Sequence, residues 1–142
     1  MMRRRGLAGV LLAGVLCFVG CGGPMQPDEL ARSIEALEST AAEGALLADH
    51  VARDRSKNTF VRAHARELGE TVEHEAEKLN DAEGEPENGV APAKAKAIDL
   101  ADQISAALGR IQTAPGDEAE GGAAQTELST LSEKAGKLAE GL

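Results

Sequence analysis

Apolar residues recur in alternating steps of four and three from residue 30 to residue 51, and this heptad spacing limits what the 142-residue chain can fold into. A helix with such a repeat carries one apolar seam, which must pack against other helices. The first predicted helix, Asp28 to Asp54, has the seam Leu30, Ile34, Leu37, Ala41, Gly44, Ala48 and Val51. Gly44 costs about 1 kcal/mol of helix propensity relative to alanine, so it either admits a close neighbouring helix or is merely tolerated.

Three further helices are predicted by the same kind of spacing. The second, about 59–82, has the apolar face Val61, Ala65, Leu68, Val72, Ala76 and Leu79. The third begins near Pro92, a favourable first-turn position, and presents Ala97, Leu100, Ala101, Ile104, Leu108 and Ile111. The fourth, about 123–142, presents Leu128, Leu131, Ala135, Leu138 and Leu142.

Short polar connections separate these segments. Residues 83–91 (EGEPENGVA) and 114–122 (APGDEAEGG) contain the Gly and Pro residues that interrupt helices. We therefore predict one all-α domain, an antiparallel up-down-up-down four-helix bundle. The first connection, residues 53–58, contains no Gly or Pro. A continuous helix through it, giving an elongated helical hairpin or a coiled-coil dimer, is the alternative.

The first twenty residues are typical of an export signal. Arg3, Arg4 and Arg5 precede an apolar run over residues 6–20, shorter than the roughly 20 residues that a membrane-spanning helix needs. Phe18-Val19-Gly20-Cys21 resembles the lipobox of bacterial lipoproteins, which usually has Leu at the position of Phe18. The resemblance implies cleavage before Cys21 and acylation of that residue. A plain secreted protein and a retained membrane helix are the alternatives.

This resemblance divides the chain into a signal peptide (1–20), a short lipidated linker (21–27) and an acidic helical bundle (28–142). It places the protein on the extracytoplasmic side of the bacterial cell envelope, held on a membrane by the lipid on Cys21. Six residues, 22–27, would separate the lipid from the first helix. The first and third connections would then lie far from the membrane, and the second connection and the C-terminus would lie near it.

The two connections at the far end carry opposite charges. The first is basic, with Arg53, Arg55, Lys57 and Arg62, and the third is acidic, with Asp117, Glu118 and Glu120. We expect these turns to neutralise one another in part. One alternative is that the two turns are solvated loops that barely interact. A functional alternative is that the basic turn contacts an anionic wall polymer or a partner protein.

Charge and cysteine content exclude several classes of partner and mechanism. Cleavage before Cys21 leaves 12 basic residues against 24 acidic ones, a net charge of −12. Such a surface is repelled by phosphate backbones, so no nucleic-acid partner is expected. Cys17 would be lost with the signal and Cys21 would carry lipid, which leaves no thiol for a disulfide, a nucleophile or a metal.

The histidines are the remaining candidates for a metal site. In the predicted hairpin His50 and His64 fall at about the same level on neighbouring helices, so they are the metal-site candidates. None of the three histidines belongs to the Glu-x-x-His motif of di-iron bundles. His74 has Glu70 and Glu77 within helical reach. We expect no metal to be bound. The acidic second connection, with Asp81, Glu83, Glu85 and Glu87, lacks the spacing of an EF-hand loop and is expected to be solvated.

Catalytic motifs of the common enzyme classes do not occur in the sequence. Phe60 is the only aromatic residue after Cys21, which disfavours ligands recognised by stacking. We therefore predict neither an enzyme nor a cofactor. The expected function is that of a non-catalytic helical binding, adaptor or structural module whose partner is an envelope protein or a wall polymer. A solute- or metal-binding envelope bundle is the alternative, and the oligomeric state is left open.

Overall fold

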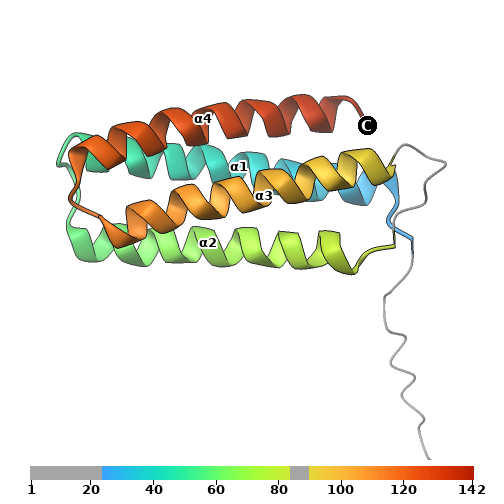
Figure 1. Ribbon diagram of the computed structural model, residues 1–142, viewed down its shortest axis with the longest axis horizontal. Coiled ribbons are helices and arrows are strands. Elements are labelled where there is room, and N and C mark those ends of the chain that lie inside the picture. The colour runs from blue at the N-terminus through green and yellow to red at the C-terminus, as the bar shows by residue number, and fades with distance from the viewer. Residues whose placement is uncertain (1–23, 84–89) are drawn as a thin grey trace, which may run out of the picture.

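The computed structural model describes residues 24–83 and 90–142. These residues form four helices and no β-strand: α1 (Pro27–Ala52), α2 (Asn58–Asp81), α3 (Val90–Thr113) and α4 (Glu118–Glu140). The helices lie side by side along one long axis and alternate in direction (Figure 1). The predicted antiparallel four-helix bundle is therefore confirmed. The predicted signal peptide, Cys21 and most of the second connection lie outside the described residues.

The bundle consists of two closely packed helix pairs, and α1 makes smaller contacts with α2 and α3. α1 packs along α4, α2 packs along α3, and α3 also touches α4. Residues 53–57 and 114–117 connect helices at the same end of the bundle, which we call the distal end (Figure 1). The start of α1, the end of α2 and the C-terminus lie at the opposite end, as the sequence predicts.

The predicted seams form the core. All seven seam residues of the first predicted helix are buried, and so are all six of the third. In α4, Leu138 is only partly buried, and Leu142 lies beyond the helix and is 42% exposed, so its predicted place in the core is wrong.

Glu75 occupies a core position of α2 that was predicted for Ala76. The strict alternation of steps continues from Val72 to Glu75 to Leu79, and Glu75 is buried whereas Ala76 is only partly so. Glu75 Oε1 accepts a hydrogen bond from Lys78 Nζ at 2.8 Å. Oε2 is buried without a partner among the described residues.

The start of α1 is tied down earlier than predicted. The N-cap is Gln26, not Asp28, and Gln26 N donates to the Glu29 carboxylate at 3.3 Å, with Pro27 at the first helical position. Met25 is buried, and its backbone N–H donates to Glu83 O at 2.9 Å. The bundle therefore begins about at Met25, and the six-residue linker predicted from 22 to 27 is shorter.

The start of α4 contradicts the predicted break over residues 114–122. Asp117 is the N-cap, and its side chain accepts a hydrogen bond from Glu120 N at 3.0 Å, so the helix begins at Glu118. Gly121 lies inside the helix and against α1. A Cβ at this position would lie 2.6 Å from Ala52 N and 3.0 Å from Ala48 O, so only glycine permits this approach of the two backbones.

Gly44 has a packing role as well, which decides the question that its sequence position left open. A Cβ there would lie 2.9 Å from Leu108 Cδ2 and 3.2 Å from Leu128 Cδ1. The first connection is a true turn, because α1 ends at Ala52 and Asp54 has a φ of 49°. That left-handed conformation stops the helix without Gly or Pro, so the continuous-helix alternative is wrong.

Candidate functional site

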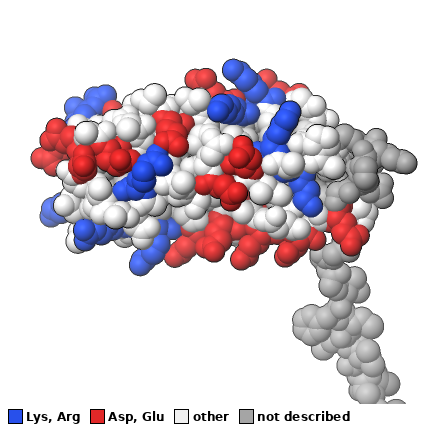
Figure 2. All heavy atoms as spheres, viewed as in Figure 1, with Lys and Arg blue, Asp and Glu red and all other residues white. Residues whose placement is uncertain are grey.

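Charge is distributed unevenly along α2 and the turn before it. Residues 53–66 contain five Lys or Arg and one Asp, whereas residues 67–83 contain seven Asp or Glu and one Lys. Figure 2 shows Lys and Arg gathered at the end where α2 begins and Asp and Glu along the remainder of the helix. Residues 53–66 are therefore a locally basic stretch in a chain that is acidic overall.

Few of these distal cations are neutralised by neighbours. Arg53 pairs with Asp49 at 2.8 Å, and Arg66 lies 3.8 Å from a Glu70 oxygen. Three cations are exposed and form no ion pair within the described part of the chain: Arg55, Lys57 and Arg62. The distal end thus presents positive charge that the fold itself does not use.

One carboxylate of the acidic turn, that of Glu120, pairs with α3. Arg110 Nε donates to Glu120 Oε1 at 2.7 Å, and a second guanidinium nitrogen contacts Glu127. The hydrogen bond to Glu120 raises the pKa of Arg110 above its usual value against the lowering effect of burial, and Glu127 adds to the rise. The expected neutralisation of the basic turn by the acidic one is therefore wrong at the level of ion pairs, since the described residues contain none between them.

The two turns nevertheless touch. A Cβ at Gly116 would lie 3.1 Å from the side-chain oxygen of Asn58, the first residue of α2. The acidic and basic turns therefore lie side by side at the distal end while keeping separate ion-pair partners.

Helix stability does not account for the cations at the start of α2. The N-cap is Lys57, whose side chain makes no capping hydrogen bond, and the first turn contains no acidic residue. A cation near the positive end of the helix macrodipole is unfavourable. A lysine at the N-cap position 57 therefore reduces the stability of α2.

An exposed apolar band crosses α1 and α2 beside these cations. Leu46 is 67% exposed and Phe60 is 56% exposed. The Phe60 ring stacks on His64 with centroids 5.5 Å apart, and His64 Nε2 lies 2.9 Å from Glu43 Oε1 of α1. Glu43 and Leu46 are three residues apart on α1 and are therefore surface neighbours. The four side chains form a band that is apolar at Leu46 and Phe60 and polar where Glu43 and His64 lie between them.

The basic turn borders this band at two points. Arg55 N donates to His50 O at 2.9 Å, and His50 lies one helical turn beyond Leu46. Lys57 lies one turn before Phe60. We call the combined surface the distal face; it consists of Glu43, Leu46, Arg53, Arg55, Lys57, Phe60 and His64.

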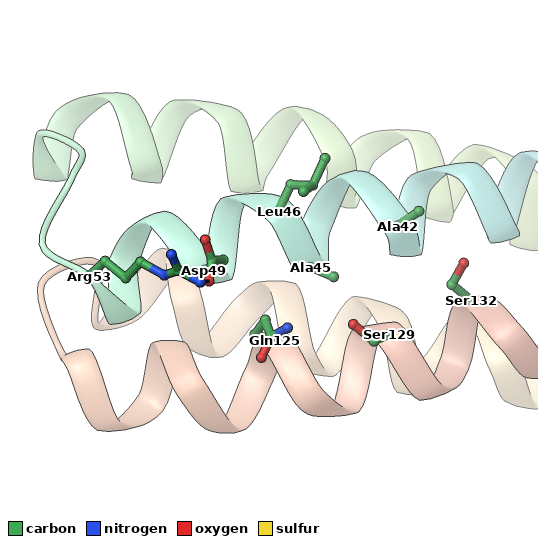
Figure 3. A pocket seen from close by; sticks show the side chains of 8 residues that line it. All are labelled: Ala42, Ala45, Leu46, Asp49, Arg53, Gln125, Ser129 and Ser132. Carbon is green, nitrogen blue, oxygen red and sulfur yellow. Dashed lines mark ion pairs between the residues drawn. The ribbon is translucent and has the colours of Figure 1, made fainter.

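A shallow groove of about 430 Å³ between α1 and α4 continues the distal face from Leu46. It is lined by Ala42, Ala45, Leu46, Asp49, Arg53, Gln125, Ser129 and Ser132. Figure 3 shows the three α4 side chains pointing toward α1, the ion pair of α1 near the turn, and Leu46 pointing away from α4. The groove is therefore small and neutral along most of its length and carries charge at its distal end.

The two metal-site candidates have separate partners. His50 Nδ1 lies 3.2 Å from Ser56 Oγ, whereas His64 contacts Glu43 and, at 3.7 Å, Glu67. Residues 24–83 and 90–142 contain no group of three or more His, Cys, Asp or Glu side chains that could hold a metal ion. His74 is exposed. In the acidic second connection Asp81 and Glu83 are exposed, while Glu85 and Glu87 lie outside the described residues.

Leu46 is the residue of this surface that sequence reasoning missed. Leu46 and Leu47 are adjacent, and neither fits the seam through Gly44, Ala48 and Val51. Leu47 is buried beside the seam, which turns Leu46 outward. The signal was therefore a leucine pair of which only one member can reach the core.

Comparison of the chain with protein-family models, with curated proteins and with solved structures finds no match. Within the described part of the chain, none of the helices has a stretch both long and apolar enough to cross a membrane.

Proposed function

We propose that the chain is a lipid-anchored protein of the bacterial envelope, acting as a non-catalytic helical binding, adaptor or structural module. The observation that carries this proposal is the lipobox-like segment Phe18-Val19-Gly20-Cys21 immediately before the bundle. Two acyl chains give stable anchoring, at about 0.8 kcal/mol for each buried methylene group. The mature domain would remain on the membrane surface.

The start of the bundle supports an orientation for this anchor. Met25 is buried and bonded to Glu83, so only residues 22–24 would lie between the acylated cysteine and the packed domain. An acylated Cys21 would therefore hold one end of the bundle close to the membrane. The distal end, with its exposed cations, would be turned away from it.

The distribution of polar groups supports a binding role over a catalytic one. The core consists mainly of Leu, Ile, Val and Ala, and Glu75 is the only buried member of the ion pairs among the described residues. A binding module needs an accessible surface with apolar and charged side chains, which the distal face supplies.

The anchor is tested by expressing the full chain in a bacterial host with a clickable palmitate analogue. Mass spectrometry of the mature protein should find an N-terminal peptide that begins with a diacylated Cys21. Cys21→Ser should abolish labelling, whereas the matched variant Cys17→Ser should keep it. An unacylated mature N-terminus, or equal labelling of the two variants, would refute the proposal.

A further inference from the structure

We infer that the distal face is a docking surface for an acidic, amphipathic segment of a partner protein. The inference rests on the proposed binding function and adds to it the surface and the chemistry of the partner. Three features of the described residues carry it: two exposed apolar side chains, cations without ion-pair partners, and the groove that continues the surface.

The exposed apolar side chains are positioned to act as anchors. Leu46 and Phe60 expose 67% and 56% of their surface, whereas most other large apolar residues of the described chain are buried. The stack on His64 holds the Phe60 ring, and the contact of His64 with Glu43 ties that ring to α1. A ring that is ordered before binding loses little conformational freedom on binding. Aromatic and arginine side chains are enriched at protein interfaces.

The cations define the charge of the partner. Arg55 and Lys57 border the apolar band, are exposed and have no ion pair among the described residues. Residues 53–66 carry five Lys or Arg against one Asp in a chain that is acidic overall, so an acidic segment is attracted to this stretch. Charge complementarity of this kind selects the orientation and speeds the encounter of two chains.

The groove gives the partner segment a course along the molecule. Its α4 wall consists of an amide and two hydroxyl groups, and its α1 wall includes two alanines. Small neutral side chains allow a second backbone to approach closely. A segment lying across Leu46 can place one apolar residue in the groove and its carboxylates near the basic turn.

A protein segment fits this surface better than an anionic membrane. The acidic turn lies beside the basic one, because Gly116 contacts Asn58, and Asp117 and Glu118 follow directly. A flat anionic bilayer at the distal end would meet both signs of charge. A narrow segment can contact the basic side alone.

The test uses the full chain, purified in a nonionic detergent, and a fluorescent model peptide. The peptide has leucines at i, i+3, i+4 and i+7 spacing and glutamates elsewhere, which makes one apolar face on an acidic helix. We expect salt-sensitive binding. Leu46→Asp together with Phe60→Asp should weaken it by roughly tenfold or more.

Charge is tested with a pair of matched variants. Arg55→Glu together with Lys57→Glu should weaken peptide binding by roughly tenfold. Lys134→Glu together with Lys137→Glu makes the same change in net charge on exposed residues of α4 and should leave binding within about twofold of the parent protein. Leu142→Asp, at the opposite end, is the control for the loss of an exposed leucine.

Several outcomes would overturn the inference. These are no binding of the peptide, equal effects of the distal and α4 charge variants, and equal binding of a peptide with its leucines scattered. Stronger binding to phosphatidylglycerol vesicles than to the peptide would favour a membrane. Self-association of the parent chain that the Leu46 and Phe60 variant abolishes, without peptide binding, would identify a second copy as the occupant. None of these readouts depends on acylation, so the inference and the anchor fail separately.

Discussion

The two turns at the distal end solve the same structural problem in opposite ways. The turn before α4 has an aspartate cap, acidic residues in the first helical turn and a glycine that lets α4 close on α1. The turn before α2 has a lysine at the N-cap, no capping hydrogen bond and a left-handed Asp54. The turn before α4 follows the rules for stable helix starts, and the turn before α2 departs from them.

This difference separates residues that serve the fold from residues that are available for another role. Around α4, Asp117, Glu120 and Arg110 are used in hydrogen bonds and ion pairs. Around α2, the side chains of Arg55 and Lys57 make no ion pair among the described residues, although the chain is acidic overall. Substitutions in the two turns should therefore act on different quantities, the unfolding free energy for one and the affinity for a partner for the other.

The largest expected effect is at Gly121. Gly121→Val should lower the free energy of unfolding by about 1–3 kcal/mol or more, because the new Cβ would lie 2.6 Å from a backbone atom of α1. Urea unfolding followed by circular dichroism measures the change.

Gly122 is the matched control for Gly121. A Cβ at Gly122 meets nothing within 4 Å, so Gly122→Ala should stabilise the protein by up to about 1 kcal/mol through helix propensity alone. Equal destabilisation by substitutions at both glycines would show that the turn before α4 is not closely packed on α1.

These glycines also mark what the sequence predicted and what it did not. The number of helices and most core residues follow from the apolar spacing within each helix, and the alternating direction follows from the short connections between them. Gly121 was predicted to interrupt a helix because it lies in a segment rich in Gly and Pro. Its packing role could not be predicted, because it depends on the distance between α4 and α1. The partners of Glu120 and His64 escaped prediction for the same reason, since Arg110 and Glu43 lie on other helices.

Removal of the cap before α4 should have the next largest effect. Asp117→Ala should destabilise the protein by about 1 kcal/mol, because Glu120 N loses its acceptor at the helix start. Thermal unfolding of the variant beside Asp117→Asn, which keeps an acceptor, isolates the cap. A loss of equal size in both variants would assign the effect to charge instead.

The opposite result is expected at the corresponding position before α2. Lys57→Asp should stabilise the protein by up to about 1 kcal/mol, because it supplies a cap acceptor and places negative charge at the helix N-terminus. The same variant should weaken binding of the acidic peptide. Destabilisation by Lys57→Asp in a urea titration would show that Lys57 supports the fold and would remove the contrast between the turns.

The smallest effects compare one arginine from each region. Arg110→Gln should destabilise the protein by less than about 1 kcal/mol, because its guanidinium, although paired with Glu120 and Glu127, is 41% exposed and therefore screened by solvent. Arg55→Gln should change the free energy of unfolding by less than about 0.5 kcal/mol, since Arg55 is exposed and forms no ion pair among the described residues. Raising the salt concentration should shrink the Arg110 effect and leave the Arg55 effect near zero. If Arg55→Gln instead proved the more destabilising of the two, the basic turn would owe its composition to stability, and no docked partner would be needed to explain it.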